Sequence, residues 1–305
     1  MFDIFKNRLE VTGTLKTITA IRISAGRSNE PIGSDLPVIK DALGNPLIPG
    51  SSFKGALRSR LESFLRGILG SDRRLVADPS DEKEWSIRSE ELSEFKKSLE
   101  KLSQYERESS LNEYIIGHTD LISRLFGSPW LASKFQVRDL TVIKDTWFGQ
   151  YQERDGVSID RDTETAADGK LYNYQVVPAG TEFEFKCVVE NAEGWELGLL
   201  MIGLHQFEAE QIPLGGGRSR GLGVVKLTID KMNWIDVTKE VEKDPEDGLF
   251  NPNKLKNSEP DPQKMLKYLK KLAGLEEAQE REPVPSDEER KTQWTQELIT
   301  YLSCI

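Results

Sequence analysis

The segment GSDLPVIKDALGNPLIPGSSFKGALRSRLE (33–62) brings a Gly- and Pro-rich turn to the start of a periodic helix, where Ser51 and Ser52 stand. Free backbone N–H groups and the helix dipole favour an anion at such a start. Lys54 and Arg58 add positive charge, so a nucleic-acid phosphate suits this turn. The simpler alternative is a helix capped by serine with cations on its surface.

A second segment, LGGGRSRGLG (214–223), is rich in glycine and arginine. Gly215, Gly216 and Gly217 would let a ligand backbone approach closely, while Arg218 and Arg220 could clamp phosphates. The pattern GxxxxGK[ST] is absent, so this is not a nucleotide-binding P-loop. A flexible turn between a helix and a strand is the open alternative.

Asp35 lies in a Gly/Ser/Pro turn just upstream of the first segment. One carboxylate cannot hold a metal cluster, but it could share a hydrated divalent ion with RNA phosphates or orient a reacting 2′-hydroxyl. The alternative is an ordinary exposed aspartate in a turn.

Histidine chemistry has little support, because the chain has two histidines. His205 lies within a periodic apolar helix, where we expect it to pack. We expect His118 to cap a helix or to face solvent. A ribonuclease mechanism based on a histidine near the N-terminus therefore lacks its base.

Periodicity predicts the elements that must position these residues. The clearest strand is TEFEFKCVVE (181–190), which alternates apolar and polar residues. We expect further strands in 9–23 and 224–230, a helix over 196–212, and a helix after Ser51. The apolar positions of that last helix follow a 3.6-residue period: Phe53, Ala56, Leu57, Leu61, Phe64, Leu65 and Ile68.

The order of these elements predicts an α+β, ferredoxin-like (RRM-like) palm, formed by 1–70 and 119–234. We expect 71–118 to be a charged, solvated helical insertion, because its apolar stripe is thin. A long polar stretch, about 145–175, predicts a protruding loop or hairpin. We expect 235–305 to be an acidic C-terminal extension with two short helices.

The net charge of −10 over 305 residues argues at first against nucleic-acid binding. However, residues 1–70 carry ten Lys or Arg against six Asp or Glu, a net charge of +4. The insertion contributes −4 and the C-terminal extension −5, so the acidity lies outside the expected palm. Two cysteines and no long apolar run or secretory signal predict a cytoplasmic protein with no membrane association.

Four segments together resemble the RAMP superfamily, in particular the backbone subunits of Csm- and Cmr-like type III CRISPR effector complexes. They are IRISAG (21–26), DLPVIKDALGNPLIPGSSFKGALRSRLE (35–62), the stretch from DLTVIKD to TEFEF (139–185), and LGGGRSRGLGVVKL (214–227). The resemblance covers chiefly residues 9–70 and 120–230.

The resemblance implies a subunit that binds guide CRISPR RNA and cleaves complementary target RNA by attack of the target's 2′-hydroxyl. Asp35 matches the family's catalytic aspartate, with a magnesium or manganese ion assisting, and 145–175 matches its thumb hairpin. The RNA contacts expected on this basis are Arg27, Ser51, Ser52, Lys54, Arg58, Gly215, Gly216, Gly217, Arg218 and Arg220.

Expected partners are other effector subunits of the same superfamily and the large polymerase-like subunit. The insertion 71–118 has no cysteine, so we expect none of the zinc sites that many Csm-type subunits carry. The unmatched acidic extension indicates a variant branch, similar to type III-D. Two alternatives stay open: a non-catalytic guide-RNA scaffold, and an endonuclease that processes guide precursors.

Overall fold

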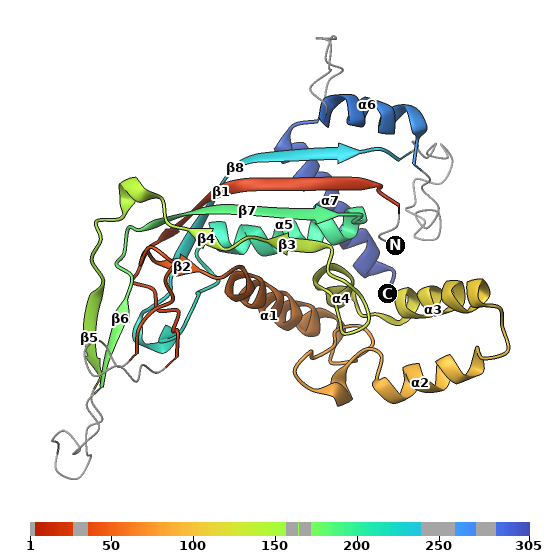
Figure 1. Cartoon of the computed structure of the whole chain (residues 1–305), viewed down its shortest axis with the longest axis horizontal. Coiled ribbons are helices and arrows are strands. Elements are labelled where there is room, and N and C mark those ends of the chain that lie inside the picture. The colour runs from red at the N-terminus through yellow and green to blue at the C-terminus, as the bar shows by residue number, and fades with distance from the viewer. Residues whose placement is uncertain (1–3, 27–35, 157–163, 165–171, 239–259, 273–284) are drawn as a thin grey trace.

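The structure is a computed structural model of the whole chain, and it describes residues 4–26, 36–156, 164, 172–238, 260–272 and 285–305 (Figure 1). The strands are β1 (Asn7–Thr17), β2 (Leu47–Ile48), β3 (Phe135–Val137), β4 (Leu140–Thr141), β5 (Gln152–Gly156), β6 (Tyr172–Val176), β7 (Glu182–Glu190) and β8 (Val225–Asp236). The α-helices are α1 (Gly50–Leu69), α2 (Ser89–Ser98), α3 (Gln104–His118), α4 (Leu121–Phe126), α5 (Gly194–Glu208), α6 (Pro262–Leu272) and α7 (Asp287–Ser303). The short 3₁₀ turns are η1 (Glu82–Glu84), η2 (Lys144–Thr146) and η3 (Arg218–Arg220).

A four-stranded antiparallel sheet with the order β3-β7-β1-β8 forms the centre of the fold. The alternation expected for 181–190 is confirmed, because Phe183, Phe185, Cys187 and Val189 are buried on one face. Strand β1 ends at Thr17, earlier than the expected 9–23. Strand β8 continues to Asp236, beyond the expected end at 230.

Helices α1 and α5 lie against the same face of the sheet (Figure 1). Phe53 of α1 joins the layers, since its ring lies 5.0 Å from Phe185 on β7 and 4.4 Å from Phe207 on α5. Gly203 lets the two helices approach, because a Cβ there would meet Leu57 at 2.5 Å. The mixed α/β class with an antiparallel sheet is therefore confirmed.

Two of the apolar positions of α1 are exposed, and the packing role expected for His205 was wrong. Phe64 and Ile68 of α1 are 45% and 54% exposed, because the buried stripe of this helix follows Phe53, Leu57, Leu61 and Leu65 and leaves them at its margin. His205 is also exposed, and its Nδ1 lies 3.3 Å from Glu208.

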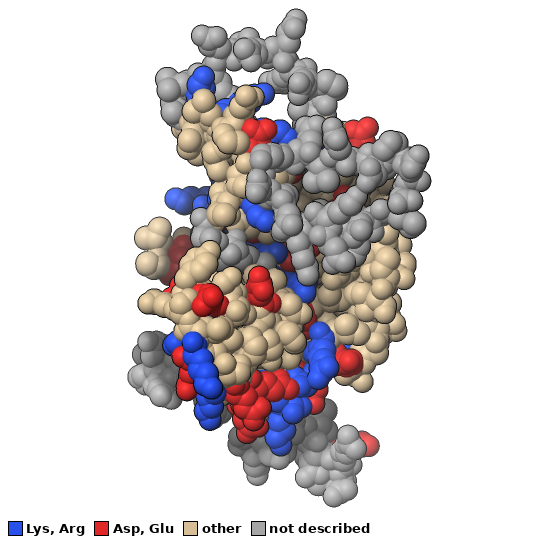
Figure 2. All heavy atoms as spheres, turned by 90° about the vertical axis from the view of Figure 1, so that its right-hand side faces the viewer, with Lys and Arg blue, Asp and Glu red and all other residues tan. Residues whose placement is uncertain are grey.

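The insertion, which the sequence predicts to be helical, contains two separate helices, α2 and α3. Leu92 is buried in α2, no residue of α3 is buried, and Phe95 stacks on Tyr114 with their ring centres 4.0 Å apart. Figure 2 shows Lys/Arg and Asp/Glu side chains intermingled on the lower part of this end of the molecule. The described insertion is therefore a charged surface excursion with a small apolar contact.

The C-terminal segment departs from the expected solvated extension. Trp294 and Leu298 of α7 are buried in the main core, and Tyr301 stacks on Trp195 of α5 at 4.5 Å. Gly198 provides the room, because a Cβ on it would collide with the backbone of α7 at Trp294. Helix α7 therefore packs into the main core, even though its exposed residues are charged.

Among the described residues, none of the helices is both long and apolar enough to cross a membrane.

A buried ion pair fastens the edge strand to the helical layer. Lys134, next to β3, donates to both carboxylate oxygens of Glu196 on α5 at 2.7 and 2.5 Å, and the side chains are 2% and 1% exposed. Glu196 also accepts the N–H of Glu193, which closes the first turn of α5. Removing one partner would leave a charge in the core without compensation.

We predict that Lys134→Met lowers the free energy of unfolding by about 3–5 kcal/mol. Lys134→Met/Glu196→Gln should recover part of this loss, because neither residue then carries a buried charge. Urea denaturation of the four proteins in the cycle measures the coupling. Lys16→Met breaks the exposed pair with Glu182 and serves as the control, with an expected loss of about 0.2–1 kcal/mol. A loss for Lys134→Met no larger than the control would contradict the assignment.

Candidate nucleic-acid interface

A groove of about 510 Å³ lies where the first turns of α1 meet the chain that follows α5. The two segments singled out in the sequence therefore converge. The groove is lined by Ser51, Ser52, Gly55, Ala56, Ser59, Arg60, Ser63, Gln211, Ile212, Pro213, Gly215 and Arg218. Among these lining residues both charged ones are arginines, so the groove is cationic in a chain of net charge −10.

The helical period explains what α1 contributes. Ser52, Ser59 and Ser63 fall within about 40° of one another at 100° per residue, opposite the buried stripe. Arg60 lies beside them, held by a 2.6 Å hydrogen bond from its Nε to Gln206 Oε1 of α5. Hydroxyl donors and a fixed guanidinium are the groups that bind sugar and phosphate oxygens. The spacing of these serines was visible in the sequence, but Ser59, Arg60 and Ser63 were not among the predicted contacts.

The N-terminus of α1 is not the open anion site expected from the sequence. The N-cap is Pro49, and neither serine caps the helix. The N–H of Gly50 donates to Asp139 Oδ1 at 2.8 Å, and those of Ser52 and Phe53 donate to Pro49 O. A carboxylate therefore already occupies this helix end, and the serines contribute their side chains to the groove instead.

Lys54 and Arg58 also point elsewhere, toward the chain around α4 and β3. Lys54 Nζ donates to Ser133 Oγ at 2.7 Å and to Phe135 O at 3.2 Å. Burial, together with the charge of Arg58, lowers the pKa of Lys54. Lys54 and Arg58 are not among the residues that line the groove with Ser51 and Ser52, and their RNA contacts stay predictions.

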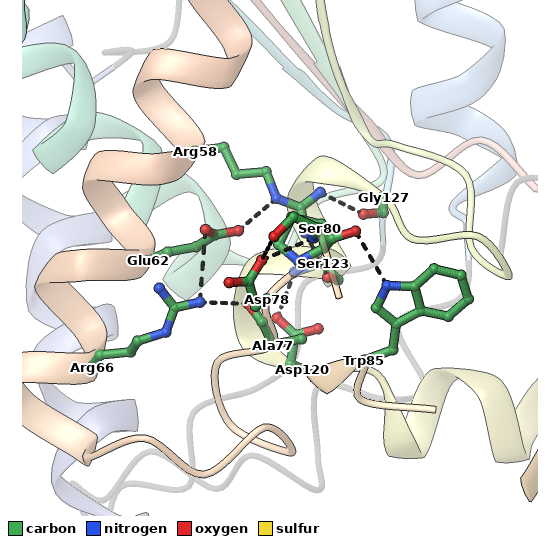
Figure 3. A network of polar contacts seen from close by, with 11 residues as sticks. Arg58, Glu62, Arg66, Ala77, Asp78, Ser80, Trp85, Asp120, Ser123 and Gly127 are labelled. Atoms are coloured by element: carbon green, nitrogen blue, oxygen red, sulfur yellow. Dashed lines mark hydrogen bonds and ion pairs between the residues drawn. The ribbon is translucent and has the colours of Figure 1, made fainter. Parts of the chain in front are cut away.

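Each of the three guanidinium nitrogens of Arg58 donates a hydrogen bond within the protein (Figure 3). The guanidinium donates to Glu62 at 2.7 Å, to Gly127 O at 2.9 Å and to Ser123 Oγ at 3.0 Å. Burial raises the pKa of Glu62, against the opposing effect of Arg58. Arg58 therefore acts as a structural tie between α1 and α4.

Positive φ angles and a close approach to the backbone at Arg22 fix the conformation of the glycine-rich loop. Gly215 and Gly217 have φ values of +80° and +77°, which favour glycine. A Cβ on Gly215 would collide with Arg22 O, the same oxygen that accepts the N–H of Gly216 at 2.8 Å. The loop then closes as η3, with Arg218 Nε donating to Gly215 O at 3.1 Å. Arg218 is thereby aimed into the groove, whereas Gly216 and Gly217 are not among its lining residues.

The hairpin of β5 and β6 lies beside this loop and makes one contact with it and one with Arg22, the residue on which the loop rests. Arg220 Nη1 donates to the hydroxyl of Tyr172 at 2.8 Å, and the Arg22 guanidinium lies 5.0 Å from the ring centre of Tyr174. The buried Nε of Arg22 has no hydrogen-bond partner. Arg22, Tyr172 and Tyr174 were not predicted as contacts. Nothing in the local sequence around YNYQV (172–176) indicates that Tyr174 would meet Arg22, which lies about 150 residues earlier in the chain.

Asp35 and Arg27 lie outside the described residues, so their predicted roles stay predictions. The chain on either side of the omitted segment is described, and the N–H of Ala25 donates to Pro37 O at 3.0 Å. Leu36 pairs with Tyr174 of β6, and the N–H of Gln175 donates to Leu36 O at 3.1 Å. Both flanks thus lie at the base of the hairpin.

Within the described part of the chain, no three His, Cys, Asp or Glu side chains cluster as a metal site would require. The divalent ion and the absence of zinc stay predictions.

Comparison with known proteins identifies the family of this chain. A profile of the RAMP superfamily matches residues 14–226, which include β3, β7, the residues that line the groove and the glycine-rich loop. The chain belongs to the RAMP superfamily. It is similar to two proteins named CRISPR system Cms endoribonuclease Csm3. The one from Enterococcus italicus is 23% identical over 231 residues, 75% of this chain and 94% of the relative. The one from Mycobacterium tuberculosis is 45% identical over 56 residues, 18% of this chain and 24% of the relative.

We predict that Gly215→Ala in this RAMP protein distorts the loop at a cost of about 1–3 kcal/mol in unfolding free energy, because the new methyl group strains the positive φ and meets Arg22 O. Gly216→Ala is the matched control, since its Cβ would meet nothing nearer than Arg22 O at 4.0 Å. Thermal unfolding and binding of single-stranded RNA measure both effects. Equal behaviour of the two variants would contradict the loop geometry.

We further predict that Arg60→Gln/Arg218→Gln weakens RNA binding and flattens its salt dependence by about 0.7 in slope for each phosphate that the variant no longer neutralises. Lys54→Gln should leave this slope unchanged while lowering stability, because Lys54 bonds to Ser133 and Phe135. Fluorescence anisotropy over a range of salt concentrations measures the slopes. A flatter slope for Lys54→Gln would show that Lys54 contacts RNA, as the sequence predicts.

Proposed function

We propose that this protein is a guide-RNA-binding backbone subunit of a type III CRISPR effector complex and that it cuts the target RNA paired to the guide. The observation that carries the proposal is the convergence of α1 and the glycine-rich loop on one groove with Arg60 and Arg218. Two relatives named as CRISPR endoribonucleases support the same assignment. Its partners would be guide and target RNA, other subunits of the superfamily and the large polymerase-like subunit, in the cytoplasm.

We further infer a ferredoxin-like palm. The strands β1, β3, β7 and β8, with α1 after β1 and α5 after β7, follow the order of a split βαβ fold, in which the first and third strands are central. Helix α7 would be an addition to this unit. The β5–β6 hairpin would be the base of the thumb that reaches into the guide–target duplex, as its ties to the glycine-rich loop favour.

The proposed reaction is a transesterification at the target strand. The 2′-oxygen of one nucleotide attacks the adjacent phosphorus and its proton passes to a base. The bond from phosphorus to the 5′-oxygen of the next nucleotide breaks, and that oxygen takes up a proton from water. The products are a 2′,3′-cyclic phosphate and a 5′-hydroxyl end. Asp35 would orient the 2′-hydroxyl or accept its proton, and a magnesium or manganese ion would supply positive charge that neutralises the phosphate. Support for Asp35 comes from Leu36, the next residue, which pairs with β6.

The histidines do not support guide-precursor processing by histidine chemistry. His118 stacks on Tyr114 in the insertion, and His205 pairs with Glu208, while neither lines the groove. The alternative function, a non-catalytic guide-RNA scaffold, differs from the proposal only in that Asp35 takes no part in cleavage.

The test uses the assembled complex with guide RNA and a complementary labelled target. We predict that Asp35→Ala slows divalent-dependent cleavage by about 10²-fold or more, because the 2′-hydroxyl loses its positioned carboxylate. Guide binding should stay unchanged. Asp230→Ala removes an exposed carboxylate on β8 and is the control. If the cuts persist in Asp35→Ala, Asp35 is not catalytic and the protein is a guide-RNA scaffold. If that variant loses guide binding, the proposed role of Asp35 in catalysis alone is refuted.

A further inference from the structure

Gly55 lies on the groove side of α1, about one turn after Ser52 and one turn before Ser59. Its backbone has the ordinary helical conformation, so an L side chain could stand there without strain. Glycine inside a helix is less favourable than alanine, because it loses more conformational freedom on folding. The glycine at this position therefore weakens α1 and is not required by the local backbone.

Packing within the protein does not require this glycine either. A Cβ on Gly50, at the start of the same helix, would meet Val137 O at 2.6 Å. A Cβ on Gly203 of α5 would meet Leu57 at 2.5 Å. A Cβ on Gly55 would meet no described atom within 4 Å, and Gly55 lines the groove. The space beside its Cα is thus open to a ligand.

The polar groups around Gly55 are available to that ligand. The hydroxyls of Ser52 and Ser59 have no hydrogen-bond partner among the described residues, whereas Ser93 of α2 donates to the carbonyl one turn earlier. Within the same part of the chain, Arg60 and Arg218 each bond through Nε alone, at 2.6 and 3.1 Å. Their Nη groups therefore remain for phosphate oxygens.

The groove suits the backbone of a nucleic-acid strand better than its bases. None of the described residues that line it is aromatic, so it offers no ring on which a base could stack. Hydroxyl and guanidinium groups bind sugar and phosphate oxygens. A strand in this groove would therefore turn its backbone toward α1.

We propose that the sugar–phosphate backbone of the bound RNA lies directly on α1 at Gly55. The bare Cα lets the strand come within reach of the serine hydroxyls and the arginines, and a methyl group there would hold the strand away. This inference rests on the proposed function, because it assumes that the groove binds RNA. It predicts that one methyl group has opposite effects on stability and on binding.

The test uses the full chain and two single-stranded probes, oligouridine and oligoadenosine. Gly55→Ala should raise the Tm by about 1–3 °C, since alanine favours the helix and its methyl group meets nothing in the protein. The same variant should bind oligouridine about 5-fold more weakly, because the methyl group overlaps the strand. Scanning calorimetry and fluorescence anisotropy measure the two effects.

Two further readouts separate a backbone contact from other causes of weaker binding. The salt dependence should keep the slope of the unmodified protein, because Gly55→Ala removes no charge. The loss should be equal for oligoadenosine, because contacts to the sugar–phosphate backbone carry no base information.

Gly67→Ala is the matched control on the same helix. A Cβ on Gly67 also meets no described atom within 4 Å, but Gly67 lines neither the groove nor the pocket beside α4. This variant should raise the Tm in the same way and leave the Kd for oligouridine unchanged.

An unchanged Kd for Gly55→Ala, or a loss confined to one of the two probes, would overturn the proposal. A lower Tm for Gly55→Ala would also overturn it, because packing within the protein would then require the glycine. If the unmodified protein binds neither probe, the proposed RNA groove is refuted, and the role of Gly55 falls with it.

Discussion

The packing of one face of α1 decides where every candidate functional group of that helix points. Phe53, Leu57, Leu61 and Leu65 are fixed against the sheet and α5. Because an α-helix advances 100° per residue, this contact turns the serines of the helix toward the glycine-rich loop. The same rotation turns Lys54 and Arg58 toward α4 and β3, where carbonyls, hydroxyls and Glu62 receive them. The buried apolar stripe therefore directs the serines of α1 to the groove and directs Lys54 and Arg58 to hydrogen bonds within the protein.

The loop on the other side of the groove depends on close backbone approach. Arg22 O accepts the N–H of Gly216 and lies where a Cβ of Gly215 would stand, so the loop can follow the chain at Arg22 only with glycine at 215. The side chain of Arg22 then lies over Tyr174 of the hairpin. Groove, loop and hairpin base are thus linked through a single residue, and a change in one of them would be felt by the others.

The sequence predicted those features that depend on local pattern. The alternation in 181–190 and the apolar period of 53–65 gave a strand and a helix, and the two glycine- or serine-rich segments do converge. Features that depend on distant partners could not be predicted in this way. Lys54 and Arg58 look like free surface cations until residues 123–135 fold against them. Helix α7 looks solvated because only Trp294 and Leu298 are buried, and their partner surface on α5 contains a glycine that signals no helix contact by itself.

The described solvent face of the sheet lacks the side chains with which RNA-recognition modules bind RNA, and this favours the groove as the proposed RNA-binding surface. RNA-recognition modules with a similar layered scaffold expose aromatic side chains on their sheet, where bases stack. The described residues on this face of β1 and β7 include no aromatic, and their charges are paired: Arg8 with Glu190, Lys16 with Glu182, and Lys186 with Glu10. A neutral face without stacking rings offers little to a polyanion. The unpaired guanidinium Nε of Arg22 and the two arginines of the groove lie instead on the loop side of the fold, so that side offers more to a polyanion than the sheet face does.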